Sequence, residues 1–258
     1  MAGLIKPVVA ELQIDITQGT VKPMPIAISD LTGSTGQEKR IGEDIASVIA
    51  ANLERSGLFK PLNKKSFIQK LDSEQSIPRF GDWRIINAQA LVHGRSKILP
   101  DGRLRVEFRL WDVFAEKQMV GLAYSTQSTA WRRVAHIIAD AVYKRITGES
   151  GYFDTRIVYI AERGLATKRI KKLAIMDQDG ANHKFLTDGK NLVLTPRFSP
   201  NQQEIAYLSY YGNLPRVYLW NIDSGRQRVL GDFPGMTYAP RFSPDGKNVI
   251  MSMAKGGN

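Results

Sequence analysis

Apolar residues recur at helical spacing in two stretches of the chain. In the first stretch they lie on one face of a helix that ends near Gly57: Ile41, Ile45, Val48, Ile49 and Leu53. In the second, the spacing predicts a helix from Trp131 to Thr147, stopped by Gly148, with this apolar face: Trp131, Val134, Ala135, Ile138, Val142 and Ile146. Because each helix is apolar on one side only, both are expected to pack against another layer.

Strand patterns lie around and between these helices. Residues 25–29 form a short apolar run, and the polar, glycine-rich residues 31–36 connect it to the first helix. Residues 84–126 are expected to form a three-stranded antiparallel meander. Its middle strand alternates strictly between apolar and charged positions: Leu104, Val106, Phe108 and Leu110 with Arg103, Arg105, Glu107 and Arg109. Helices packed on such a sheet predict an α+β N-terminal domain over residues 1–150.

A sequence repeat dominates the rest of the chain. Thr-Pro-Arg-Phe-Ser-Pro-Asn at 195–201 returns as Ala-Pro-Arg-Phe-Ser-Pro-Asp at 239–245, with Pro196 and Pro240 44 residues apart. A period of about 40–50 residues with several short strands is typical of β-propeller blades. Residues 151–258 are therefore predicted to form a truncated β-propeller, with two blades and the start of a third.

That number of blades does not complete a ring. Propellers close with about 4–8 blades, so two blades and a fraction leave a wide apolar blade face uncovered. We expect the chain to be the N-terminal part of a longer protein. The alternative is a domain-swapped or assembled oligomer that completes the ring.

Composition limits the chemistry of the chain. Its 258 residues include no cysteine and three histidines, which excludes disulfides, cysteine-ligated metal sites and thiol catalysis. The net charge of +11 is spread over both halves, so nucleic-acid binding is not expected. No apolar run approaches the about 18–20 residues that span a bilayer, and no secretory signal is recognised. We expect no transmembrane segment, and either a cytosolic protein or a mature form whose signal peptide has been removed.

Motifs that would bind ligands or carry out catalysis fail on spacing. Residues 33–39 do not fit the interval of a phosphate-binding loop. Asp177-Gln-Asp-Gly180 lacks the spacing of a calcium loop and is predicted to be a hairpin turn. His93 has no carboxylate at ligand or relay spacing, and His136, beside the apolar face of its helix, is expected to be a surface or hydrogen-bonded, semi-buried histidine. No catalytic residue, metal or cofactor is therefore predicted.

Several segments carry a family resemblance. The blade motif at 240–252 and the approach to it at 230–240 are similar to the repeat of the TolB family, the propeller proteins of the Tol–Pal envelope system. The opening residues 12–19 and 24–28 and the helix at 41–59 also resemble this family. The resemblance implies an α+β N-terminal domain followed by a β-propeller of TolB/WD40-like repeats.

The resemblance also implies a function. It implies a non-enzymatic periplasmic interaction scaffold that binds the peptidoglycan-associated lipoprotein through its propeller and TolA through its N-terminal segment. Such a protein associates peripherally with the outer membrane through the lipoprotein, and supports outer-membrane integrity and cell division without a cofactor. The alternative is the propeller portion of a serine oligopeptidase-like enzyme. Such an enzyme needs a G-x-S-x-G motif, which the sequence lacks.

Two groups of residues are implied as binding sites. Carried over by position, Leu12, Ile14 and Ile16 belong to the TolA-binding segment, and their alternation suits addition as a strand to a partner's sheet. The alternative is an edge strand of the protein's own sheet.

The second group lies where the third blade begins. Met236, Thr237, Tyr238 and Ala239 are expected on the loop that enters this blade, at the face that binds the lipoprotein. The alternative is that Met236 and Tyr238 only pack between blades.

Overall fold

The computed structural model describes residue 12 and residues 22–71, 77–200, 203–231 and 233–255. The chain divides into two compact units, residues 1–154 and residues 155–258, and each unit is described by itself. Within the described residues, no helix combines the length and the apolar character needed to cross a membrane.

A five-stranded mixed sheet forms the centre of the first unit. Its strand order is β2-β1-β3-β4-β5, where β1 is parallel to both neighbours and the last three strands are antiparallel. The strands are β1 (Met24–Ile28), β2 (Phe59–Pro61), β3 (Ala90–Ile98), β4 (Arg103–Asp112) and β5 (Lys117–Gln127). The predicted antiparallel meander is therefore confirmed from residue 90 onward.

Residues 84–89 depart from that prediction. They contain the end of helix α2 (Phe80–Ile85) and a turn with Asn87 at φ 59°. Trp83 of this helix is buried, and its indole N–H donates to Gln69 Oε1 at 3.0 Å. This contact spans 14 residues and therefore leaves no mark on the local strand pattern.

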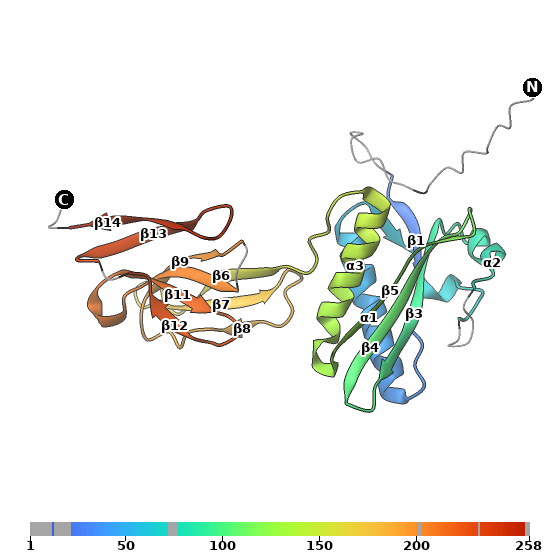
Figure 1. The fold of residues 1–258 in the computed structure, drawn as a ribbon, viewed down its shortest axis with the longest axis horizontal. Helices are drawn as coiled ribbons and strands as arrows, with labels where there is room; N and C mark the ends of the chain where they lie inside the picture. Colours follow the sequence, from blue (N-terminus) through green and yellow to red (C-terminus); the bar gives the residue numbers. More distant parts are fainter. Residues whose placement is uncertain (1–11, 13–21, 72–76, 201–202, 232, 256–258) are drawn as a thin grey trace, which may run out of the picture. The chain divides into compact units, whose positions relative to one another are not determined.

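Two long helices cover one face of the sheet (Figure 1). They are α1 (Gly36–Arg55) and α3 (Trp131–Thr147), and their apolar sides form one hydrophobic core with the inward residues of β1, β3 and β4. Helix α1 begins before its first apolar residue because Thr35 and Glu38 form a capping box. Gly148 ends α3 in the left-handed conformation, at φ 80°, as predicted.

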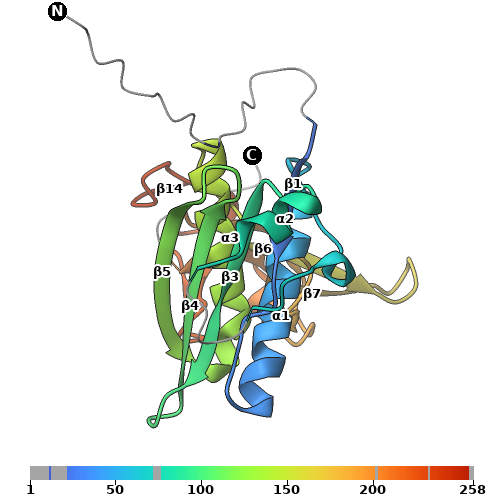
Figure 2. The ribbon, with the colours of Figure 1, turned by 90° about the vertical axis from the view of Figure 1, so that its right-hand side faces the viewer.

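The other face of the sheet is covered at one end only. Helix α2 and the segment with the short 3₁₀ helix Lys64–Ser66 pack there over a second cluster of buried residues, which includes Trp83, Leu91 and Trp111. Figure 2 views this face, where no element of the described residues covers the lower parts of β3, β4 and β5. Within the part of the chain that the structure describes, much of the sheet is thus open on one side.

Three antiparallel sheets follow one another along the second unit. The first is β6 (Arg156–Arg163), β7 (Ile170–Asp177) and β8 (Lys184–Phe185). The second has the order β12-β11-β10-β9, from β9 (Val193–Phe198), β10 (Glu204–Ser209), β11 (Arg216–Asn221) and β12 (Gln227–Val229). The third is the pair β13 (Met236–Phe242) and β14 (Val249–Ala254). Asp177–Gly180 closes a turn between β7 and β8, as predicted.

The sequence repeat is also a repeat of backbone geometry. Thr195 and Ala239 both adopt positive φ, 47° and 54°. Two residues further on, an arginine side chain donates to the carbonyl of the proline before it: Arg197 to Pro196 and Arg241 to Pro240, both at 2.9 Å. A register shift accompanies each site. Each copy of the motif therefore forms a bulge, which bends the strand where the arginine follows the proline.

Candidate partner-binding site

The four residues expected on a loop lie in a strand. Met236, Thr237, Tyr238 and Ala239 are the first residues of β13, so the loop prediction is wrong. Met236, Thr237 and Tyr238 pair with the far end of β14. Backbone pairing therefore continues back to Met236, directly after the glycine- and proline-containing approach.

Side chains in this strand alternate between solvent and the interior. Met236 and Tyr238 are 41% and 42% exposed, whereas Thr237 is 3% exposed. Thr237 Oγ1 accepts the N–H of Val217 at 2.9 Å, and the Thr237 N–H donates to the Pro215 carbonyl at 3.1 Å. Thr237 therefore joins the third sheet to the second, and the two apolar side chains beside it face outward.

Ala239 is exposed and sits at the bulge. Its φ of 54° is unusual for a residue with a side chain, and costs on the order of 1 kcal/mol. Thr195 adopts the same conformation one repeat earlier. The bulge therefore occurs in both copies of the motif. Leu192, the counterpart of Met236 44 residues earlier, is also exposed, at 40%.

A hollow of 390 Å³ lies between β10–β12 and β13–β14. Three charged residues line this hollow. Arg228 and Glu204 form an ion pair with 3.4 Å between nitrogen and oxygen, and Lys247 is the third. The rest of its lining is largely apolar: Leu219, Leu230, Phe233, Phe242, Val249 and Met251. The candidate residues of β13 are not part of this lining, so a partner on β13 would contact a strand surface and not this hollow.

The N-terminal candidates are described in part. Leu12 is partly buried against the main hydrophobic core of the first unit. Ile14 and Ile16 lie outside the described residues, so their role stays a prediction. The side chain of Leu12 is in contact with its own domain.

Both histidines singled out in the sequence have structural partners. His93 is 5% exposed, and its Nε2 accepts the indole N–H of Trp111 at 2.8 Å. Burial, together with the nearby Arg109 guanidinium, lowers the pKa of His93 to about 4. His136 is buried, with 2.8 Å between its Nδ1 and Asn52 Nδ2. The expected hydrogen bonding of His136 is confirmed, with deeper burial than expected.

Sequence reasoning missed a buried carboxylate. Glu38 is 4% exposed and accepts three backbone N–H groups, from Ser34 and Thr35 at 2.9 Å and from Ile98 at 2.7 Å. The spacing Thr35-x-x-Glu38 was the available signal, since it is that of a capping box. The bond to Ile98 has no local signal, because it joins α1 to the end of β3.

Comparison with known proteins follows the division into two units. Residues 12–119 match the model of the TolB amino-terminal domain, and residues 143–258 match that of the TolB beta propeller domain. The chain belongs to the TolB family. The α+β domain followed by the sheets of a partial propeller is thus confirmed, and the described sheets do not close a ring.

Individual relatives agree with this assignment. The chain is 60% identical over 234 residues to the Tol-Pal system protein TolB of Paramagnetospirillum magneticum, covering 91% of this chain and 52% of that protein. The crystal structure of TolB from Acinetobacter baumannii superposes with a TM-score of 0.75 at 28% identity, over 96% of this chain and 59% of that one. The chain therefore spans between half and three fifths of these TolB proteins.

Proposed function

We propose that this chain acts as part of a non-enzymatic interaction scaffold of the Tol–Pal system in the periplasm. The observation that supports this most strongly is the presence of both TolB domains in order, with 60% identity to a Tol-Pal system protein. The proposed role is to help maintain outer-membrane integrity during cell division. Loss of the gene in the source bacterium should make cells leak periplasmic enzyme, and the full-length gene should restore retention.

The proposed lipoprotein site is the outward face of the first residues of β13. Two apolar side chains, Met236 and Tyr238, are exposed there beside the buried Thr237 anchor. Large apolar and aromatic side chains of this kind are typical anchors at protein interfaces. The same anchor fixes the direction of both side chains, which lowers the entropy lost on binding.

Titration with the soluble domain of the peptidoglycan-associated lipoprotein tests this site. Met236→Ser and Tyr238→Ser should each weaken binding by at least about tenfold if they are interface anchors. Ile250→Ser is the matched control, since Ile250 is exposed on the same two-stranded sheet. Binding that is unchanged in both variants, or equally weakened in the control, would show that this strand is not the site.

The proposed TolA site is the segment that contains Leu12, Ile14 and Ile16. Because Leu12 contacts the core of its own unit, Ile14→Ser with Ile16→Ser is the cleaner test. The double variant should lose binding to the TolA domain while keeping lipoprotein binding. Retained TolA binding would refute the assignment of this segment.

A further inference from the structure

The open part of the first unit's sheet is strongly basic. We call it the basic sheet face and define it by the outward residues of β3 and β4 away from α2: Arg95, Lys97, Arg103, Arg105, Glu107 and Arg109. The first four of these residues are exposed, and Glu107 and Arg109 are half-buried. Asp101, in the turn beside Arg103, forms an ion pair with it and adds a second carboxylate among the described residues. Five cations therefore stand against two acidic groups.

The register of the sheet fixes these side chains on one side. Arg95 pairs directly with Glu107, and Lys97 with Arg105. The alternate residues of β4, such as Val106 and Phe108, are buried in the core beneath α1 and α3. A slip of one residue would bury the arginines and expose this core. The positions of the charges are therefore as well determined as the core itself.

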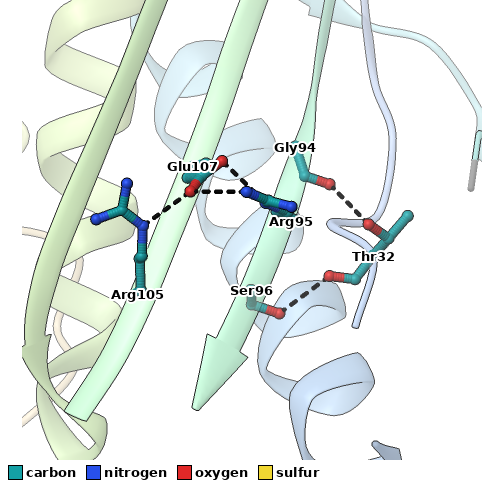
Figure 3. A network of polar contacts seen from close by, with 6 residues as sticks. All are labelled: Thr32, Gly94, Arg95, Ser96, Arg105 and Glu107. Carbon is teal, nitrogen blue, oxygen red and sulfur yellow. Dashed lines mark hydrogen bonds and ion pairs between the residues drawn. The ribbon is translucent and has the colours of Figure 1, made fainter. Parts of the chain in front are cut away.

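Glu107 organises the face without neutralising it. Its carboxylate accepts two bonds from the Arg95 guanidinium, at 2.9 and 3.0 Å, and one from Arg105 Nε at 2.8 Å (Figure 3). These arginines lower the pKa of Glu107 to about 2, so it stays ionised at neutral pH. Each guanidinium has more N–H donors than these bonds use.

A hydrogen-bonded backbone supports the same spot. Thr32 donates its N–H to the Gly94 carbonyl at 2.9 Å and accepts the Ser96 N–H at 2.8 Å, on either side of Arg95 (Figure 3 shows the side-chain contacts). A side chain at Gly94 would have its Cβ 2.0 Å from the Glu107 carbonyl oxygen. Glycine thus allows the close approach of β3 and β4 at the centre of the face.

The strand next to the cations offers a shallow floor. Gly121, Ala123 and Ser125 of β5 stand opposite Arg109, Glu107 and Arg105 of β4, and all three of these β5 residues are exposed. The small side chains of Ala123 and Ser125 let another backbone come close to the sheet, whereas the Gln118 side chain lies beside Gly121. The floor and the two cationic strands together form a flat surface instead of a pocket.

We infer that the basic sheet face binds an extended acidic segment of another protein. Alternate residues of an extended chain repeat at about 6.7 Å, as do the cations along β3 and β4, and neighbouring strands lie about 4.8 Å apart. Carboxylates at every second position of such a segment would therefore match the cations. The segment would lie across the small residues of β5.

The composition of the face favours this ligand over two others. Amphipathic membrane binding needs large apolar side chains that insert between lipids, and the defining residues of this face and its floor include none. Single-stranded nucleic acid is bound with aromatic side chains that stack on bases, and those are missing from the same set. The ligand that fits this face is therefore an extended peptide with acidic side chains.

Fluorescence anisotropy with a fluorescein-labelled peptide in which Glu alternates with Thr tests the inference. The double variant Lys97→Gln/Arg105→Gln should bind about tenfold more weakly at low salt. The control Lys39→Gln/Arg40→Gln removes the same charge from exposed positions of α1, and should change binding less than about twofold. Equal losses in the two double variants would overturn the inference.

Two further measurements separate positioned binding from general attraction. Ala123→Tyr places a large side chain on the floor without altering its charge, and should also weaken peptide binding. A purely electrostatic attraction would be unchanged by this substitution. Phosphatidylglycerol vesicles and oligouridylate are tested in the same way. If either binds more strongly than the peptide, and the K97Q/R105Q double variant weakens that binding, the proposed acidic segment is the wrong ligand. Thermal unfolding of each variant shows whether the fold is retained. These results are independent of the lipoprotein and TolA tests, which concern other residues.

Discussion

Replacing Glu38 with glutamine tests how the N-terminus of α1 is held to the sheet. The carboxylate accepts the N–H groups of Ser34 and Thr35 at 2.9 Å through one oxygen, and that of Ile98 at 2.7 Å through the other. Ser96 Oγ also donates to the Glu38 carbonyl at 2.8 Å. Glu38 therefore connects the capping loop, the helix and the end of β3.

The expected loss of stability follows from these bonds. A hydrogen bond to a charged group contributes about 1.5–3 kcal/mol, against about 0.5–1.5 kcal/mol for a neutral one. Glutamine keeps only one acceptor oxygen, so its amide leaves either Ile98 or the capping loop without a partner, at about 1–3 kcal/mol. Together these effects predict that Glu38→Gln lowers the free energy of unfolding by roughly 3–4 kcal/mol at pH 7.

The difference should depend on pH. The hydrogen bond from Ile98, followed by that from Thr35, lowers the pKa of Glu38 below its ordinary value of 4.5. The stabilisation from the ionised carboxylate is complete above 4.5 and is lost as the pH falls through the lower pKa of the folded protein. The gap between the native protein and the variant should therefore narrow in acid.

Urea unfolding followed by tryptophan fluorescence measures this gap, because Trp83, Trp111 and Trp131 all report on the first unit. Glu43→Gln is the matched control, an exposed glutamate of the same helix, and should change stability by less than about 0.5 kcal/mol. A loss below about 1 kcal/mol for Glu38→Gln, or a gap that does not change between neutral and acidic pH, would refute the reasoning.

Three further predictions concern other parts of the molecule. Thr237→Val should destabilise the second unit by about 1–3 kcal/mol in urea unfolding followed by the fluorescence of Trp220 in β11, because a buried N–H of the neighbouring sheet loses its acceptor. In an NMR titration the ring of His93 should stay neutral down to a pKa of about 4, and its burial should make the protein less stable as the pH falls from about 6.5 toward 4. Gly42→Ala should lower the melting temperature, since the new Cβ would lie 2.1 Å from the Leu31 carbonyl oxygen, whereas the control Gly36→Ala meets nothing within 4 Å and should not.

Local hydrophobic patterns predicted those helices and strands that need only some apolar layer to pack against, whichever residues form that layer. The helix at 131–147 and the alternating strand at 103–112 were read from the sequence because any apolar layer would stabilise them. The parallel pairing of β1 with both β2 and β3 was not predicted. It joins residues far apart in the chain, and hydrophobic periodicity contains no information on which strands become neighbours.

The candidate site shows the same limit at smaller scale. The family resemblance implied that Met236 to Ala239 lie on a loop, but the strand begins at Met236. Thr195, the counterpart of Ala239 one repeat earlier, also lies inside a strand, β9. No local pattern shows the hydrogen bond from the Val217 N–H to Thr237. This bond holds Thr237 inward, so that the apolar side chains on either side of it point outward.

The basic sheet face and the core of the first unit depend on one alternation. In β4 the buried Val106 and Phe108 alternate with Arg105 and Glu107, which point to the open side of the sheet. A shift in register would therefore move both sets together. The core alone, however, requires only polar residues on the open side, and serine or threonine would satisfy it. The core therefore does not require the arginines that occupy three of the four outward positions from 103 to 109. Self-repulsion among exposed cations is unfavourable without a counterion, and an acidic partner seated on the face supplies one.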